Sequence, residues 1–253
     1  MLLASKIFNL TKNVKLSAAE EREITTLVDH FAKNEKLFSV LRDQLVAAII
    51  GSVPLMAYIH SVKARIKDSE HLRDKLRRKQ LSEKASGKRL ILTTENLFLK
   101  INDLVGVRIL HLHTQQIEQI NKGLVELFQE FKYKIVEGPT AKTWDDESRD
   151  YFSSLKIKPV KSPSLYTSVH YVIDSGNRSH CTCEIQVRTL AEELWGEVDH
   201  AINYPHASQS LACREQIKAL ARATSSCSRL VDSIFRSKKD HSDGSAAYRD
   251  KRK

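Results

Sequence analysis

The sequence contains no apolar run long enough to cross a membrane. A spanning helix needs about 20 consecutive apolar residues, and the most apolar stretch, residues 45–59, is interrupted by Gly51, Ser52 and Pro54. The first residues, Met-Leu-Leu-Ala-Ser-Lys, also lack the charged segment followed by an apolar one that marks a secretory signal. We therefore expect a cytoplasmic protein that does not enter a membrane.

Cysteine is scarce, with four residues among 253. Cys181 and Cys183 are separated by one residue, whereas structural zinc sites favour pairs separated by more. On a strand, both would lie on the apolar side with Ile185 and Val187, where a free cysteine behaves as a small hydrophobic residue. Without the spacing of a disulfide framework, the cysteines are predicted to be reduced thiols that bind no metal.

Acidic residues are outnumbered by basic ones, 31 against 41, which gives a formal net charge of +10. This excess indicates polyanionic partners without choosing between nucleotides, RNA and acidic proteins. Part of it lies at the end of the chain, in Arg236, Lys238, Lys239, Arg249, Lys251, Arg252 and Lys253. We interpret this basic tail as a solvated, partly disordered end in preference to an RNA contact.

The first part of the chain is predicted to be helical. Ser17-Ala-Ala-Glu20 is a capping box, and the apolar residues that follow recur at helical spacing, which predicts a helix over residues 17–33. A second run predicts a helix over residues 37–50 that packs on the first. We expect this pair to support a catalytic sheet without carrying chemistry itself.

The rest of the chain alternates between strand and helix patterns, which predicts an α/β or α+β fold. The predicted strands cover residues 57–66, 104–112, 134–136, 167–173 and 181–187, and the predicted helices cover residues 68–79, 116–131 and 211–235. Residues 138–165 hold three of the five prolines and many charges, which favours a long functional loop.

One strand pattern carries polar residues along a single face. Glu184, Gln186 and Arg188 occupy every second position, so a strand would direct all three to one side and its apolar residues to the other. Thr189-Leu-Ala-Glu192 then forms a second capping box, which starts a helix that carries Trp195, Glu197, Asp199 and His200.

Four segments in this order resemble the synthetase domain of the RelA/SpoT family, which transfers pyrophosphate from ATP to the 3′-hydroxyl of a guanosine nucleotide. They are Val-Lys-Ala-Arg-Ile-Lys at 62–67, Ile-Asn-Asp-Leu-Val-Gly-Val-Arg at 101–108, Tyr-Thr-Ser-Val-His at 166–170, and Glu-Ile-Gln-Val-Arg-Thr at 184–189, with Trp195 and His200 behind it. The resemblance implies an α+β fold with a nucleotidyltransferase-like mixed β-sheet of about five strands flanked by helices. It also implies three parts: an N-terminal helical segment at 1–57, the catalytic domain at 58–205, and a C-terminal helix and basic tail at 206–253.

The resemblance implies that ATP is bound by Arg65, Lys67, Arg73, Lys75 and Arg108. Arg65 and Arg108 would enclose the adenine and the others would hold phosphates, which suits a guanidinium that stacks on rings and a lysine that supplies a point charge. On an ideal helix Arg73 and Lys75 lie about 200° apart, so both reach one ligand only if the first turn is irregular. The alternative is a basic surface helix that continues through residues 77–79.

Asp103 and Glu184 are the candidate catalytic carboxylates and the candidate ligands of Mg²⁺, a hard cation that takes few carboxylates besides water and phosphate oxygens. The resemblance assigns Asp103 to the metal, and assigns Glu184 to the metal and to deprotonation of the attacking hydroxyl. Asp103 and Arg108 would lie on opposite faces of a flat strand, so we expect either a bulge or an Asp103 that precedes the strand.

The resemblance implies that Tyr166 stacks on the acceptor base, that His170 contacts the acceptor phosphates, and that Gln186 and Arg188 complete this side of the pocket. Leu165 replaces the glycine usually found before this tyrosine, and residues 161–164 lack the asparagine of the family. Because these departures fall in the loop that chooses the acceptor, they leave its identity open.

The leading hypothesis is therefore a single-domain alarmone synthetase that converts GDP or GTP with ATP into guanosine tetra- or pentaphosphate and releases AMP. The alternatives are a toxin-type relative that pyrophosphorylates adenosine nucleotides or the 3′ end of tRNA, and an inactive module that binds nucleotide or RNA. Alarmone hydrolysis is not expected, because the sequence contains no His-Asp dipeptide of the kind that the hydrolase domain uses. The sequence does not decide between a monomer, a homo-oligomer and a complex with a neutralising antitoxin.

Overall fold

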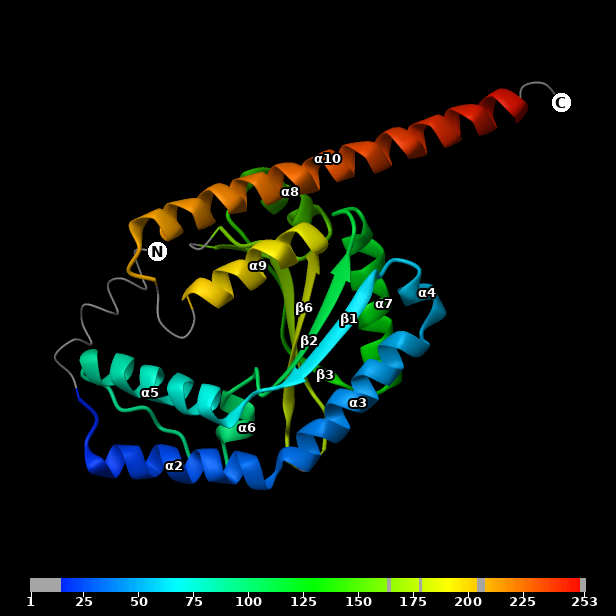
Figure 1. Ribbon diagram of the computed structural model, residues 1–253. Coiled ribbons are helices and arrows are strands. Elements are labelled where there is room, and N and C mark those ends of the chain that lie inside the picture. The colour runs from blue at the N-terminus through cyan, green and yellow to red at the C-terminus, as the bar shows by residue number, and fades with distance from the viewer. Residues whose placement is uncertain (1–14, 163–164, 178, 204–207, 251–253) are drawn as a thin grey trace.

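The computed structural model describes residues 15–162, 165–177, 179–203 and 208–250, with side chains through His241. Its centre is a mixed sheet of six strands in the order β1-β2-β6-β5-β3-β4. The strands are β1 (Ser61–Ile66), β2 (Val105–His111), β3 (Lys134–Thr143), β4 (Lys158–Lys161), β5 (Ser168–Asp174) and β6 (Thr182–Thr189). With helices on both sides of a mixed sheet (Figure 1), the predicted α+β class is confirmed, with one strand more than expected.

Two N-terminal helices, α2 (Ala18–Lys33) and α3 (Glu35–Gly51), form as predicted. The capping box is complete, because the Ser17 hydroxyl accepts from Glu20 N at 3.2 Å and the Glu20 carboxylate accepts from Ser17 N at 2.6 Å. Helix α3 packs against β1 and β2, and α7 (Gln116–Glu130) packs against α3 and β3. Helices α3 and α7 therefore cover the apolar side of the sheet.

Helix α5 (Ser69–Ala85) starts where predicted but runs beyond residue 79. Its cap is Asp68, whose Oδ1 accepts from the backbone N–H groups of Glu70 at 2.9 Å and His71 at 3.1 Å. The helix lies beside α2 (Figure 1), and two ion pairs join the two helices: Glu20–Lys84 and Glu21–Arg77. A third pair, Glu23–Arg89, joins α2 to the segment that follows α5, and the three pairs together define the α2–α5 interface.

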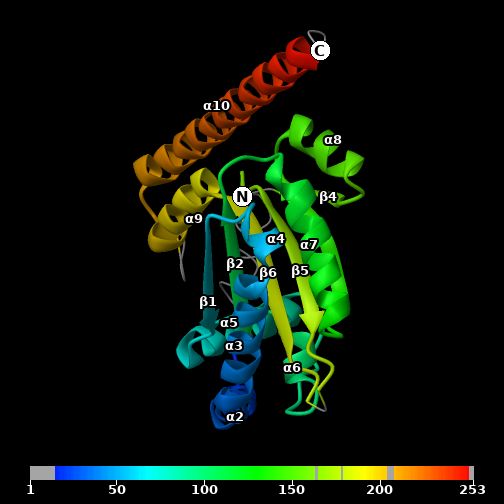
Figure 2. The ribbon, with the colours of Figure 1, turned by 90° about the vertical axis from the view of Figure 1, so that its right-hand side faces the viewer.

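Helix α9 (Leu190–Asn203) follows β6 directly and lies over the other side of the sheet, against β6 and β2. Half of its predicted capping box forms: Thr189 Oγ1 accepts from Glu192 N at 3.2 Å, but the Glu192 carboxylate accepts from Thr167 N. Figure 2 shows α9 and α7 on opposite sides of the strands.

Helix α10 (Leu211–Asp250) packs along α9 and then runs past the sheet (Figure 1). The prediction that this helix ends at Phe235 and is followed by a tail was wrong, because the helix is 40 residues long. The side chain of Arg249 and residues 251–253, which were assigned to the basic tail, lie outside the described part of the chain.

The predicted loop over residues 138–165 was also wrong. Strand β3 continues through Pro139 to Thr143, and β4 and helix α8 (Asp146–Ser154) follow. Pro139 lies within a shift of the β3–β5 register, and Pro159 lies in the short edge strand β4. Because irregular and edge positions tolerate the missing N–H of proline, neither proline interrupts the sheet.

Two smaller differences concern the segments before β1 and β2. Strand β1 starts at Ser61 and not near residue 57, because the preceding residues form the short helix α4 (Val53–Met56). The short helix α6 (Leu97–Lys100) was not predicted. In the described ranges, no helix is long and apolar enough to span a membrane.

Candidate active site

The strand register collects the predicted site residues on one face of the sheet. Lys63 of β1 is paired with Arg108 of β2, Arg108 with Gln186 of β6, and Gln186 with His170 of β5. Since paired residues on neighbouring strands point to the same side, these form a polar face to which Arg65, Glu184 and Arg188 also belong. The alternate residues Val107, Ile185 and Tyr171 are buried in the core, so the predicted alternation in β6 is confirmed.

Asp103 lies just before β2, as the sequence indicated, and is held between two lysines. Its Oδ2 lies 2.9 Å from Lys67 Nζ and its Oδ1 lies 2.6 Å from Lys75 Nζ. Burial raises the pKa of Asp103, but the charges of Lys75 and Lys67 outweigh this effect and hold the pKa below its ordinary value. The carboxylate is therefore ionised at neutral pH.

Arg73 does not join this group. Its guanidinium donates to Thr25 Oγ1 on α2 at 3.0 Å and to Glu70 at 3.4 Å. Because the first turns of α5 are regular, Arg73 and Lys75 point in different directions, as expected from their spacing on a helix.

Glu184 is oriented by two neighbours on the polar face. Its Oε1 lies 3.1 Å from His170 Nδ1, and its Oε2 accepts from Gln186 Nε2 at 3.0 Å. Burial lowers the pKa of His170 despite the nearby carboxylate, so a neutral imidazole donates from Nδ1. Burial raises the pKa of Glu184, but the hydrogen bonds from His170 and Gln186 and the nearby positive charge together outweigh it and lower the pKa, so Glu184 is an ionised acceptor.

The two candidate metal carboxylates have separate partners. Glu184 is paired with Gly106, and Asp103 precedes Gly106 by three residues, which corresponds to roughly 10 Å along the strand. Within the described part of the chain, no group of three or more His, Cys, Asp or Glu side chains could hold a metal ion. A cation at either carboxylate would therefore need ligands from water or substrate.

Tyr166 is partly buried at the other end of the polar face. Its ring centroid lies 5.9 Å from that of His170, 6.0 Å from that of Trp195 and 5.7 Å from the guanidinium carbon of Arg188. Its hydroxyl donates to Gln186 Oε1 at 3.4 Å, and burial raises its pKa. The structure thus brings together all four predicted acceptor residues.

Leu165, which occupies the position where the resemblance predicts a glycine, adopts a left-handed backbone with φ of 55°. This region costs a non-glycine residue about 1 kcal/mol. The Leu165 side chain packs against the cluster of Trp195, Ile217 and Ala221. Leu165 therefore keeps the backbone conformation that glycine adopts most easily, and its side chain packs on α9 and α10 next to Tyr166.

Two buried atoms of this region have neither a hydrogen-bond partner nor an ion-pair partner among the described residues. They are Nε2 of His170, which is an acceptor when Nδ1 carries the proton, and Nε of Arg188, which is a donor. Buried polar atoms are normally paired, so their occurrence in two predicted acceptor residues is consistent with a ligand that supplies the missing partners.

Three charged residues of this face were not among the predicted site residues. Lys142 of β3 has its Nζ 3.5 Å from His170 Nδ1, and it was missed because it fell in the predicted loop. Glu193 and Glu197 of α9 both contact Arg108. Their spacing of four residues, on a helix that directly follows Arg188, is a signal from which they could have been found.

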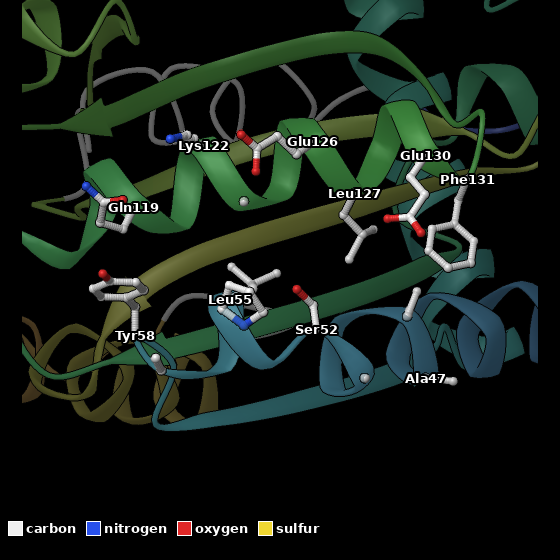
Figure 3. Close-up of a pocket in the computed structure, with 15 residues that line it drawn as sticks. Ala47, Ser52, Leu55, Tyr58, Gln119, Lys122, Glu126, Leu127, Glu130 and Phe131 are labelled. Atoms are coloured by element: carbon white, nitrogen blue, oxygen red, sulfur yellow. The ribbon is translucent and has the colours of Figure 1, made fainter.

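A separate groove of about 740 Å³ lies between α3–α4 and α7 (Figure 3). Leu55 and Leu127 lie in it, and Tyr58, Lys122 and Glu126 line its walls. None of the predicted site residues lines it. The candidate active site is therefore the polar face, on the other side of the sheet.

Comparisons with known proteins identify the family of the chain. A family model described as a region found in RelA / SpoT proteins matches residues 64–209. GTP pyrophosphokinase YjbM of Bacillus subtilis (strain 168) is 26% identical over 154 residues, which cover 60% of this chain and 65% of the length of that relative.

Two crystal structures share the fold. Small alarmone synthetase 1 from Bacillus subtilis superposes with a TM-score of 0.61 at 19% identity, over 84% of this chain and 99% of that chain. The same synthetase bound to its product pppGpp superposes with a TM-score of 0.54 at 19% identity, over 79% and 92% of the respective chains.

Proposed function

Because the chain belongs to the RelA/SpoT family, we propose that it is a pyrophosphokinase that transfers the β,γ-pyrophosphate of ATP to the 3′-hydroxyl of GDP or GTP. The observation that carries the proposal is the division of the polar face into two parts. One part gathers cations around Asp103, and the other gathers Tyr166, His170 and Arg188 around Glu184. The relative named GTP pyrophosphokinase and the fold that holds pppGpp support this assignment.

The cations form the ATP side. Arg65 and Arg108 lie on neighbouring strands, where their guanidinium faces would enclose an adenine. Lys67 and Lys75, which neutralise Asp103 in this structure, would bind the phosphates. Arg73 would complete the set after its side chain turns away from Thr25.

Tyr166 and its neighbours form the acceptor side. The tyrosine ring would stack on the guanine, because a large ring on a short side chain gains contact area at little entropic cost. His170, Gln186 and Arg188 would bind the rest of the nucleotide, and the unpartnered Nε2 of His170 and Nε of Arg188 offer it one acceptor and one donor. Lys142, beside His170, adds a cation for the acceptor phosphates.

The reaction is an in-line displacement at the β-phosphorus of ATP. The ribose 3′-oxygen forms a bond to this phosphorus, and the bond to the oxygen that bridges the α- and β-phosphorus atoms breaks, so AMP leaves with that oxygen. Glu184, ionised and oriented by His170 and Gln186, accepts the hydroxyl proton. Positioning and charge neutralisation supply most of the acceleration in reactions of this type.

The two candidate carboxylates are of the chemical type that binds Mg²⁺. Asp103 and Glu184 are both ionised, and nucleotide phosphates and water would complete the ligand shell. When bound, the ion would neutralise charge on the transferring phosphates.

A second candidate function is pyrophosphorylation of an adenosine nucleotide or of the 3′ end of tRNA. The observation that favours it is Leu165, which departs from the family glycine next to Tyr166 and packs on α9 and α10. The net charge of +10 is compatible with an RNA acceptor.

The test is to incubate the protein with Mg²⁺ and γ-³²P-labelled ATP, offer GDP, GTP, ADP or deacylated tRNA, and separate the products by thin-layer chromatography. Label on GDP or GTP supports the first proposal, and label on ADP or tRNA supports the second. Absence of transfer to every acceptor would contradict both and favour a binding module without turnover.

A further inference from the structure

A single buried carboxylate, that of Glu193 on α9, contacts cations from three strands. Its Oε1 lies 3.1 Å from Lys63 Nζ of β1 and 3.4 Å from Arg108 Nη1 of β2, and its Oε2 lies 2.5 Å from Arg188 Nη2 of β6. The side chain of Glu193 is 7% exposed and that of Arg188 is 3% exposed. An arginine this deeply buried needs a counter-charge, because an unpaired buried cation is costly.

The contact with Arg108 fixes the ATP side. A guanidinium donates hydrogen bonds in its own plane, so the flat faces stay available for stacking. Glu193 and Glu197 both bind the Nη1 edge of Arg108. They therefore set the orientation in which Arg108 would meet an adenine ring.

The contact with Arg188 fixes the acceptor side. Arg188 Nη1 lies 3.4 Å from the Tyr166 hydroxyl, and the guanidinium carbon lies 5.7 Å from the ring centroid. On its other side Arg188 faces Gly196 of α9, where a Cβ atom would lie 2.6 Å from Nη1. The guanidinium is thus confined between Tyr166, Glu193 and a helix position that has no side chain.

We propose that Glu193 is a positioning residue that holds both nucleotide subsites at once, through Arg108 on the ATP side and through Arg188 and Tyr166 on the acceptor side. The inference rests on the proposed function, because it takes these residues as nucleotide contacts. It assigns a role to a residue that is not among the nucleotide contacts proposed above and that lies on α9, the helix over the polar face.

The test compares dissociation constants, measured by calorimetry, for a non-hydrolysable ATP analogue and separately for GDP. Glu193→Gln keeps the shape but removes the charge, and a charged hydrogen bond contributes enough that each dissociation constant should rise on the order of tenfold. Glu197→Gln should weaken binding of the ATP analogue but not of GDP, because Glu197 contacts Arg108 and not Arg188. Glu215→Gln, which removes an exposed pair with Lys218, is the matched control and should change neither value.

Loss of stability is separated from loss of positioning by a double variant. Arg188→Met/Glu193→Gln removes the buried pair together and leaves no unpaired buried cation. The dissociation constant of the ATP analogue should be higher for this double variant than for Arg188→Met alone. The ratio of the two values should equal the increase seen for Glu193→Gln in the wild-type background. Unchanged binding of either ligand in Glu193→Gln, or unchanged binding of the analogue in this comparison, would overturn the inference. A wild-type protein that binds neither nucleotide would instead overturn the proposed function beneath it.

Discussion

Two parts of the molecule use the same residue types for different purposes. In the α2–α5 interface, acidic side chains of α2 pair one to one with basic side chains of α5 and of the segment after it, and the Glu23–Arg89 pair is 54% and 75% exposed. On the polar face, carboxylates are shared: the half-buried Asp103 lies between two lysines, and the buried Glu193 lies among three cations. Both regions contain paired charges, but only the second places one carboxylate among several cations and buries a pair, Glu193 and Arg188, almost completely.

The difference indicates where charge serves stability and where it serves function. Exposed pairs typically contribute well under 1 kcal/mol, and the α2–α5 interface can lose any one of them at little cost. Burying several ions is expensive, and their mutual attraction seldom repays it. A surplus of cations held by few carboxylates therefore suggests a site that expects a further anion, such as a nucleotide phosphate.

The largest expected effect is the loss of activity in Asp103→Asn. The substitution leaves Lys67 and Lys75 without their carboxylate and removes a candidate metal ligand, so turnover should fall by about a thousandfold. The measurement is the initial rate of pyrophosphate transfer, with circular dichroism to confirm that the fold persists. Near-normal turnover would show that the shared carboxylate is no more important than one in the α2–α5 interface.

The second effect concerns the pH dependence of stability. Burial raises the pKa of Glu192 from 4.5 to about 7, so the folded state binds its proton more tightly than the unfolded state. The stabilisation is fully present below about pH 4.5 and is lost as the pH rises through about 7. Since one pKa unit corresponds to about 1.4 kcal/mol, this contribution to the free energy of unfolding is at most about 3.5 kcal/mol.

Urea unfolding between pH 4.5 and 8 measures this contribution. Glu192→Gln, which cannot titrate, should flatten that part of the profile, whereas Glu23→Gln in the α2–α5 interface should retain it. Identical pH profiles for wild type and Glu192→Gln would contradict the assignment.

A smaller effect is expected for Tyr166→Ala. Because base-aromatic stacking contributes about 1–3 kcal/mol, the acceptor KM should rise about tenfold or more while the ATP KM changes little. Steady-state kinetics with each substrate varied in turn measures the two values. Equal changes in the two KM values would argue against a stacking role. Tyr166 would then contribute to both nucleotide sites, as the shared charges of the polar face do.

The smallest effect is expected for Arg89→Met, which breaks an exposed pair of the α2–α5 interface. The free energy of unfolding should change by less than about 0.5 kcal/mol, and the difference should disappear in high salt. Denaturant titration at low and high ionic strength makes this measurement. A decrease of more than about 2 kcal/mol in the free energy of unfolding would show that exposed pairs of the α2–α5 interface matter as much to stability as buried ones.

The parts of the fold that could be predicted from the sequence are those with strong local signals. The capping box at Ser17 and the alternation from Cys183 to Arg188 each involve neighbouring residues, so periodicity alone identified them. The strand after Gly138 was missed because prolines and charges were given more weight than sheet pairing. That pairing depends on β5, a distant segment whose register accommodates Pro139 at an irregularity.

The candidate site could be predicted only in part for the same reason. Residues within the four matching segments were found, and the register brings most of them together. Arg73 points to α2, which no local sequence pattern reveals. Glu193 contacts cations from three different strands, and these strands come together only in the folded sheet under α9. A side chain whose role comes from its tertiary neighbours leaves little trace in a single sequence.

Gly196 shows how this arrangement would affect protein engineering. In a search for thermostable variants, a glycine inside a helix is among the first positions to be changed to alanine, because the substitution usually gains up to about 1 kcal/mol. In α9 the new methyl carbon would lie 2.6 Å from Nη1 of Arg188, so the guanidinium that contacts Glu193 and Tyr166 would have to shift. The change that helix propensity recommends most strongly would therefore disturb the acceptor side of the site.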